Sequence, residues 1–462
     1  MLLGIAMKKT IIAQTLFGLF STLMLVGGQV HSAVAATSGL EVNELNAEGT
    51  LLAQGELLTE ETQASLNQWL PELLKQINQL PEVQAQITRQ QQAELAIAAA
   101  DRAIYNPELG LNYQNAATDT YSLGLSQTLD WGDKRGVATR LAQLEAQILL
   151  ADIQLERSQM LAERLLALAE QAQSNKALTF AEQQLRFTQA QLNIAEQRFA
   201  AGDLSDVELQ LLKLELASNT ADYALAEQAA LVADGKVIEL LGVDKLGFRE
   251  FIPEIGQWVT QMTPKVNLPA LTSAHQQVLL AKANAMKVKA DTAADPTINL
   301  GAEKEGDDNK FGVGVAIPLQ VRNNYSELQA VADKGIAIAE QNYLARERVL
   351  TAKQAQFTNA LPRLLARYQD WRERVAASGS KAAKSLSEQW RSGDVSTSEY
   401  LQSRRQLAAS YLVGLNLETA IYQSWLTWMG DSGQLLPMID TLADTSVGKS
   451  RSISSTHAVP AK

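Results

Sequence analysis

The chain has 462 residues, a formal net charge of −11, only three histidines and no cysteine. It therefore cannot form disulfides or thiolate metal sites, and no lipid can be attached to an N-terminal cysteine. The negative charge argues against binding to nucleic acid or to an anionic membrane face, and three histidines argue against a histidine-ligated metalloenzyme. The sequence also has no phosphate-binding glycine-rich loop and no catalytic triad, so we expect no enzyme activity, catalytic residue, cofactor or metal site.

The N-terminus has the pattern of a secretory signal peptide. Two lysines precede an apolar run over 11–26, and Ala33-Val34-Ala35 offers a small-residue cleavage site. We expect residues 1–36 to be this signal peptide, with either Met1 or Met7 as the start. A membrane anchor is the alternative, although the run is short for a bilayer span of about 20 residues.

Later in the chain no stretch approaches the length of an apolar membrane-spanning helix, so any membrane that the mature chain spans must be spanned by strands. Residues 37–80 are predicted to be an N-terminal periplasmic segment. We expect this segment to be loosely structured, with a break at Pro71 and another at Pro81, which follows it directly.

The sequence contains the same landmarks twice, in the same order. Such self-similarity predicts a tandem duplication, with repeats over 81–242 and 269–432, an equatorial linker over 243–268 and a disordered tail over 433–462. The longest landmark, Phe199-Ala-Ala-Gly-Asp-Leu-Ser-Asp-Val-Glu208, returns as Trp390-Arg-Ser-Gly-Asp-Val-Ser-Thr-Ser-Glu399. Three shorter ones return with it: Leu80-Pro81 as Leu268-Pro269, Asn106-Pro107 as Asp295-Pro296, and Leu129 as Leu319.

Helices dominate the first repeat. A helix over 82–106 is predicted to end before proline, and a strand hairpin follows over 107–130. A helix over 137–201 has no glycine or proline and would be about 100 Å long, and a shorter helix over 205–241 returns. The two shorter helices together match the long one, so we expect them to stack end to end beside it.

The second repeat follows the same plan. Its strand hairpin is predicted over 296–319, with a polar turn at 305–310, and its long helix contains Pro362. The proline either kinks this helix near the linker or splits it into two helices.

Large apolar residues alternate with small or polar residues in the predicted strands. Leu109, Leu111 and Tyr113 show this period of two in the first repeat, as do Phe311 and Val313 in the second. Each run has about the length of a tilted strand that crosses a bilayer. A half-buried hairpin of a soluble sheet is the alternative.

Each long helix is predicted to end in a tight turn that starts the return helix. Gly202 supplies a left-handed helix end, and Ser205 with Glu208 forms a capping box. Ser396 and Glu399 repeat this box. Both landmarks therefore predict a helix–turn–helix tip.

Together these elements make a mainly α chain with a small β part, and the order of its elements resembles the TolC-like outer-membrane efflux factors. Two segments are most similar to the heavy-metal (CzcC-like) branch: Leu125-Ser-Gln-Thr-Leu-Asp-Trp-Gly-Asp-Lys-Arg-Gly136, and Ile317-Pro-Leu319 followed by Arg322-Asn323. The resemblance implies a homotrimer in the outer membrane of a Gram-negative bacterium, with a twelve-stranded barrel in the lipid and a helical periplasmic tunnel. It also implies a periplasmic adaptor and an inner-membrane proton-driven efflux pump as partners.

By this resemblance the tips contact the adaptor and form the gate. The predicted partner contacts are Gly202, Asp203, Leu204, Ser205, Gly393, Asp394, Val395 and Ser396. The candidate gate residues are Asp203, Asp206, Asp394, Arg198 and Arg391. The alternatives are that the aspartates complement the helix dipole, which is the commoner role of such residues, and that the arginines are solvated charges.

The predicted function is a passive exit duct of a tripartite efflux system, with heavy-metal cations as its first-choice cargo. A multidrug or type I secretion duct of the same family is an alternative cargo class. A soluble periplasmic coiled-coil scaffold or adaptor is the alternative of a different class.

Overall fold

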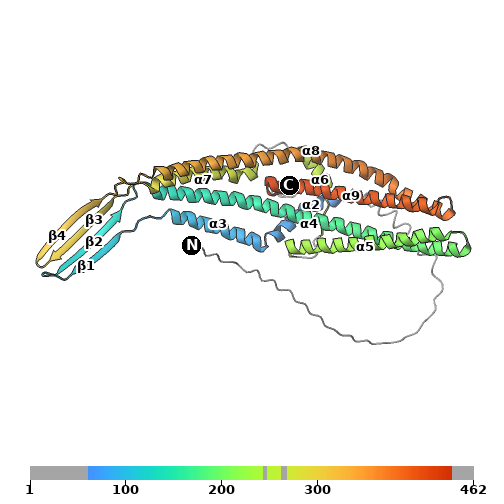
Figure 1. Cartoon of the computed structure of the whole chain (residues 1–462), viewed down its shortest axis with the longest axis horizontal. Coiled ribbons are helices and arrows are strands. Elements are labelled where there is room, and N and C mark those ends of the chain that lie inside the picture. Colours follow the sequence, from blue (N-terminus) through green and yellow to red (C-terminus); the bar gives the residue numbers. More distant parts are fainter. Residues whose placement is uncertain (1–60, 243–246, 262–267, 440–462) are drawn as a thin grey trace, which may run out of the picture. The chain divides into compact units, whose positions relative to one another are not determined.

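The computed structural model describes residues 61–242, 247–261 and 268–439, all within the unit Ala47–Lys462. The predicted signal peptide and both possible starts lie outside the described residues. The elements along the chain are α2 (Glu61–Ile77), α3 (Pro81–Ala100), β1 (Glu108–Gln114), β2 (Thr120–Thr128), α4 (Lys134–Ala201), α5 (Asp206–Leu241), α6 (Ile252–Gln261), α7 (Pro269–Asp291), β3 (Thr297–Glu305), β4 (Asp308–Ala316), α8 (Ser326–Ser392) and α9 (Thr397–Ser432) (Figure 1).

The duplication is confirmed by the lengths and the packing of the helices. The long helices α4 and α8 have 68 and 67 residues, and the return helices α5 and α9 have 36 residues each. Both α3 and α5 pack on α4, and both α7 and α9 pack on α8. Two short helices therefore accompany each long one, as predicted.

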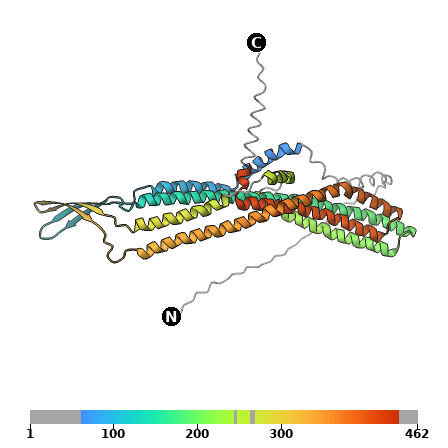
Figure 2. The ribbon, with the colours of Figure 1, turned by 90° about the horizontal axis from the view of Figure 1, so that it is seen from above.

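The elements follow one lateral order along the unit. The sheet is ordered β1-β2-β3-β4, and next to it the helices contact one another in the order α3–α4–α7–α8, which can be followed in Figure 2. Beyond the middle of the long helices the order becomes α5–α4–α9–α8. We call these two parts the sheet half and the tip half. One lateral edge carries β1, α3 and α5, and the other carries β4 and α8.

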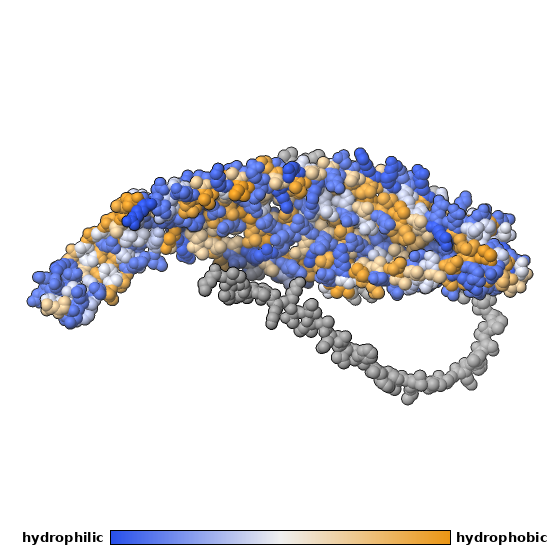
Figure 3. Space-filling view, in the orientation of Figure 1, coloured by the Kyte–Doolittle hydropathy of each residue, from blue (hydrophilic) through white to orange (hydrophobic). Residues whose placement is uncertain are grey.

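The antiparallel sheet has one apolar face and one face of small and polar residues. Leu109, Leu125 and Leu300 are paired across three strands, and Val313 follows on the fourth. These side chains are exposed, as is Phe311 at 85 %. Figure 3 shows hydrophobic side chains over the strands and hydrophilic ones at the hairpin turns. The alternation predicted from the sequence is confirmed.

Glycines form a row across the polar face. Gly110, Gly124, Gly301 and Gly312 are paired in register across all four strands. A Cβ atom added at Gly301 or Gly312 would meet no atom within 4 Å. Packing within the chain therefore does not require these glycines.

The middle of the unit contains the large hydrophobic core, which we call the equatorial cluster. It joins Val83 of α3 and Val237 of α5, so the adjoining ends of the two short helices share one core. The predicted linker is partly helical, since α6 packs into this cluster and its Trp258 stacks on Trp425 of α9, with ring centroids 5.3 Å apart.

Several predicted boundaries were wrong. The helix predicted over 82–106 ends at Ala100. The segment predicted to be loosely structured contains the helix α2, which continues through Pro71. The predicted turn at 305–310 is shorter, because β4 already begins at Asp308. The long helix α8 continues through Pro362, so the interpretation in which proline splits it is also wrong.

The predicted tail begins later than expected. Residues 435–439 are helical, and Leu435 and Ile439 are buried in the equatorial cluster. The hydroxyl of Ser158 on α4 donates to the carbonyl of Gly433 at 3.2 Å and accepts from the amide of Leu436 at 3.3 Å. These contacts attach the end of α9 to α4. The rest of the predicted tail lies outside the described residues.

Candidate partner-contact site at the hairpin tips

Each hairpin tip turns at a glycine in the left-handed conformation. Gly202 has φ 84° and Gly393 has φ 86°. The amide of Asp203 donates to the carbonyl of Arg198 at 2.8 Å, and Asp394 repeats this bond at 2.9 Å. Because an L side chain is strained at such φ values, glycine is the residue that ends these helices with least cost.

The predicted capping boxes are confirmed at both tips. The hydroxyl of Ser205 donates to Glu208 at 2.7 Å, and the amide of Ser205 donates to the same carboxylate at 3.1 Å. Ser396 and Glu399 make the same bonds at 2.8 and 3.2 Å. Hydrogen bonds from the serine side chain and backbone lower the pKa of both glutamates, and for Glu208 they outweigh the effect of burial.

Two sets of contacts join the first tip to the second. The guanidinium of Arg198 donates to the carbonyl of Trp390 at 3.2 Å and lies 5.6 Å from the centre of its ring. The indole N–H of Trp390 donates to the hydroxyl of Thr397 at 3.2 Å, and this hydroxyl donates to Glu208 at 3.0 Å. Glu208 therefore caps its own helix and also binds the other tip.

A small hydrophobic core lies beneath these bonds, which we call the tip cluster. Trp390 stacks on Tyr400 with ring centroids 5.0 Å apart, and both side chains are 1 % exposed. Residues of both repeats form this core: Leu192, Ala195, Leu204, Leu209, Leu212, Trp390, Tyr400 and Leu401. The two tips of one chain are thus packed as one body.

Most of the predicted contact residues lie at the surface of the tips. The exposed ones are Gly202, Asp203, Ser205, Gly393, Asp394 and Ser396. Leu204 is the exception, since it is 8 % exposed and belongs to the tip cluster, and Val395 is half-buried against that cluster.

The candidate gate residues are not paired with one another. Asp203, Asp206 and Asp394 are exposed, and Asp394 accepts from the hydroxyl of Ser392 at 2.6 Å. Within the described residues no ion pair joins these aspartates to Arg198 or Arg391. Arg198 instead contacts Trp390, as described above. Their role in a gate stays a prediction.

Trp390 and Thr397 are the residues that sequence reasoning missed at this site. The repeat places Trp390 at the position of Phe199, so the sequence has an aromatic residue three positions before each tip glycine. This recurrence could have indicated an aromatic packing position at the tips. Thr397 follows a capping serine, and its local sequence does not indicate that it is 1 % exposed.

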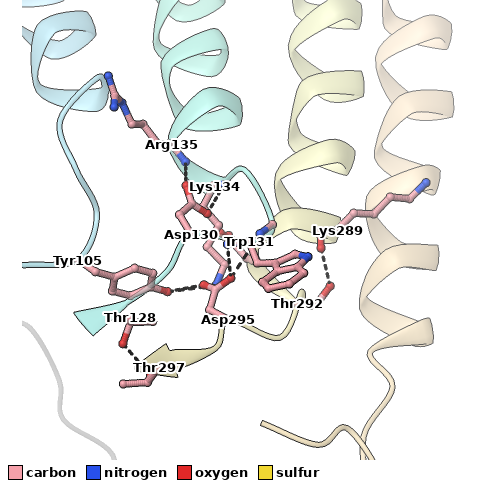
Figure 4. Close-up of polar contacts among 12 residues, drawn as sticks. Tyr105, Thr128, Asp130, Trp131, Lys134, Arg135, Lys289, Thr292, Asp295 and Thr297 are labelled. Carbon is pink, nitrogen blue, oxygen red and sulfur yellow. Dashed lines mark hydrogen bonds and ion pairs between the residues drawn. The ribbon is translucent and has the colours of Figure 1, made fainter. Parts of the chain in front are cut away.

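A second polar site lies where the strands meet the helices. Asp295, which precedes β3, accepts from the phenol of Tyr105 at 2.7 Å and from the ammonium of Lys134 at 2.6 Å (Figure 4). The amides of Trp131 and Gly132 donate to it at 3.2 and 3.4 Å. Burial would raise the pKa of Asp295, but the bonds from Lys134 and Tyr105 outweigh it and lower this pKa.

The segment that resembles the heavy-metal branch lies at this junction. Asp130 caps the start of α4, because its carboxylate accepts from the amides of Lys134 and Arg135 at 2.8 Å each (Figure 4). Asp295 was recognised in the sequence only as part of a repeated landmark. Asp130 thus holds the first turn of α4, and Asp295 links Tyr105 to the segment Trp131–Lys134.

The described residues contain no group of three or more histidine, cysteine or acidic side chains that could hold a metal ion. None of the described helices combines the length and the hydropathy that a bilayer span requires.

No family model matches the sequence, and no curated protein sequence matches it significantly. Several solved structures do share its architecture. The outer-membrane protein VceC of Vibrio cholerae matches with a TM-score of 0.65 and 15 % identity, over 79 % of this chain and 98 % of that one. The chain has a TolC-like fold.

Other channels with this TolC-like fold match to a similar degree. The outer-membrane channel CmeC of Campylobacter jejuni has a TM-score of 0.62 and 10 % identity, over 88 % of this chain and 90 % of that one. CusC, described as forming a transmembrane channel, has a TM-score of 0.62 and 16 % identity, over 80 % and 92 %. These neighbours are channel proteins and not enzymes, and they do not single out the heavy-metal branch.

Proposed function

We propose that the chain is one protomer of a homotrimeric exit duct in the outer membrane of a Gram-negative bacterium. The duct passively conducts cargo to the exterior, and a periplasmic adaptor and an inner-membrane proton-driven pump supply the energy and open the tips. The observation that carries this proposal is the four-stranded sheet with one continuous, exposed apolar face.

The sheet supports assembly in lipid for two reasons. Leu111, Val313 and Phe311 are 76 %, 77 % and 85 % exposed, and burying apolar surface of this kind is favourable by about 25 cal/mol per Å². The outer strands β1 and β4 each have one edge that pairs with no described strand. Unpaired backbone groups in hydrocarbon cost several kcal/mol each, so copies must pair edge to edge. Three copies would supply twelve strands.

The alternative of a soluble coiled-coil scaffold is disfavoured by the same face. A scaffold in water gains nothing from a sheet whose whole apolar face is exposed, and such a surface promotes aggregation. The described long helices are compatible with either interpretation, whereas the exposed apolar face of the sheet favours the duct.

Heavy-metal cations are the proposed cargo, on the strength of the segments at 125–136 and 317–323. The chain would conduct these ions without ligating them, since no metal-holding group is present among the described residues. Drugs or other small molecules are the second cargo class, because the structural neighbours do not single out the heavy-metal branch.

Two experiments test the proposal in sequence. The chain should fractionate with the outer membrane, require detergent for extraction and migrate as a trimer. Recovery as a soluble periplasmic monomer would contradict the duct. The cargo is then tested by deleting the gene and measuring growth inhibition by Zn, Co, Cd, Cu and Ag against dyes, detergents and antibiotics. Selective sensitivity to drugs would keep the duct and reject metal cargo.

A further inference from the structure

The apolar surface of the sheet continues beyond the ends of the strands. After β4 the alternation runs on through Ile317, Leu319 and Val321, which are 56 %, 78 % and 85 % exposed. After β2 it runs on through Leu129 and Trp131, which are 39 % and 75 % exposed. Exposed apolar side chains therefore reach the connections between the strands and the helices.

Aromatic side chains mark the two ends of this apolar surface. Tyr113 and Tyr121 lie near the first hairpin turn with ring centroids 5.0 Å apart, and Trp131 lies at the other end. An extended chain from Tyr121 to Trp131 spans about 33 Å, or about 25 Å across a membrane when the strand tilts by about 40°. The apolar band of a membrane barrel has about this height and is bordered by aromatic residues. The strand–helix connections therefore fall at the border of the lipid.

One exposed basic residue lies at each of the four strand–helix connections. We call these residues the basic row: Arg102, Arg135, Lys289 and Arg322. They belong to the neighbouring lateral positions of α3, α4, α7 and α8, and each lies within about one helical turn of the sheet-side end of its helix. Figure 4 shows two of them, Arg135 and Lys289, in the same region as Trp131.

Three members of the basic row have no protein partner for their charge. Arg102, Lys289 and Arg322 form no ion pair and no side-chain hydrogen bond with any described residue. Arg135 differs, because it pairs with Asp101 at 3.0 Å. Three cations are thus available to a partner outside the chain.

Carboxylates close in sequence to the basic row are occupied by other contacts or placed at helix starts. Asp291 pairs with Lys287, and Asp130 accepts from amides of α4. Asp133 and Glu327 are exposed at the starts of α4 and α8, where the helix dipole favours a negative charge. The cations of the row therefore lie beside apolar surface without being paired within the chain.

We propose that the basic row binds the phosphate groups of anionic phospholipids in the membrane leaflet next to the helices. Arginine and lysine lay their aliphatic stems on apolar surface and extend their charged ends to the head groups. Trp131 lies beside them, at the level where aromatic residues anchor barrels. This inference rests on the proposed function, because it requires the apolar face of the sheet to lie in lipid.

The charge of the row selects among phospholipids. A zwitterionic head group carries its own ammonium beside the phosphate, so it gains little from a further cation. An anionic head group such as phosphatidylglycerol has no such compensation, and each basic residue near the membrane surface attracts it. The duct therefore surrounds itself with anionic lipid at this border.

Fluorescence quenching by brominated lipids tests the preference, because Trp131 lies at the basic row. The full chain is reconstituted into phosphatidylcholine vesicles that contain the same low fraction of either brominated phosphatidylglycerol or brominated phosphatidylcholine. The signal of Trp131 is the difference between the wild type and Trp131→Phe. Phosphatidylglycerol should be enriched about fivefold beside Trp131, and the enrichment should shrink in about 0.5 M NaCl.

Two charge variants locate the preference. The combined variant Arg102→Gln, Lys289→Gln and Arg322→Gln should lose the enrichment, so that both brominated lipids quench Trp131 equally. The matched control removes three exposed charges from the tip half of α8 and should keep the enrichment: Arg363→Gln, Arg374→Gln and Lys384→Gln.

The outcomes separate this inference from the proposed function. Equal quenching of the wild type by both lipids would overturn the lipid site and leave the duct intact. Enrichment that survives in the combined variant, or that is lost in the control as well, would also overturn it. If no brominated lipid quenches Trp131, the sheet does not lie in lipid, and the proposed function fails together with the inference.

Discussion

The two hairpin tips share one backbone design and differ in what surrounds it. Both end at a left-handed glycine and begin again with a serine–glutamate capping box. Yet Phe199 of the first tip is 42 % exposed, whereas Trp390 at the same place in the second is 1 % exposed. Glu208 of the first tip also accepts from Thr397 of the second. The repeated sequence thus determines the conformation of both turns. The contacts between the turns are not repeated, because at each pair of equivalent positions only one residue makes them.

Truncating the buried Trp390 should cause the largest loss of stability at the tips. Trp390→Ala leaves a cavity in the tip cluster and removes the stack on Tyr400, so the tips should lose about 3–5 kcal/mol of local stability. The matched change Phe199→Ala should cost about 1 kcal/mol or less. Hydrogen exchange of the amides flanking both tips measures the two losses, and equal losses would show that the tips are not packed asymmetrically.

Removing the hydroxyl that joins the tips should have the next largest effect. Thr397→Val keeps the shape but leaves the buried indole N–H of Trp390 without its acceptor, at a cost of about 1–3 kcal/mol. Asp206→Asn, at the matching first position of α5, should change stability by less than about 1 kcal/mol. Hydrogen exchange of the tip amides, measured at increasing urea concentrations, gives the local free energy of unfolding of each variant for comparison. A Thr397 variant as stable as the Asp206 variant would contradict the contact between tips.

What the sequence predicted correctly is what local physics decides. Gly202, Ser205 and Glu208 specify a turn and a cap within a few residues, and period-two alternation specifies a strand face. The contact between Thr397 and Glu208 spans 189 residues, and no local pattern announces it.

The failures have the same cause. The helix predicted to reach Asn106 stops at Ala100, and Tyr105 beyond it contacts Asp295, far along the chain. Leu435 was assigned to the disordered tail, but it is buried in the equatorial cluster, and the amide of its neighbour Leu436 bonds to Ser158 of α4. Tertiary contacts override local preference at both ends of the predicted repeats.

Removing the capping serines should have a smaller effect that is similar at the two tips. Ser205→Ala and Ser396→Ala each remove one hydroxyl acceptor and one donor to a carboxylate, at about 1 kcal/mol each. Ser205→Ala should cost slightly more, because it also releases the glutamate that holds Thr397. The free energies of unfolding of the two variants, measured by thermal or urea denaturation, test this. A larger loss of stability in Ser396→Ala than in Ser205→Ala would contradict the assigned asymmetry.

Acid should loosen the contact between tips through Glu208 and not through Glu399. Serine hydrogen bonds lower the pKa of both glutamates, so their stabilisation is complete above the unfolded value of about 4.3 and is lost as pH falls through the lower folded value. Only Glu208 is linked through Thr397 to the indole N–H of Trp390. The NMR signal of that N–H should therefore shift as pH falls below about 4.3 in the wild type and in Glu399→Gln, and should stay nearly constant in Glu208→Gln. A shift that survives in Glu208→Gln would mean that another group couples acid to the second tip.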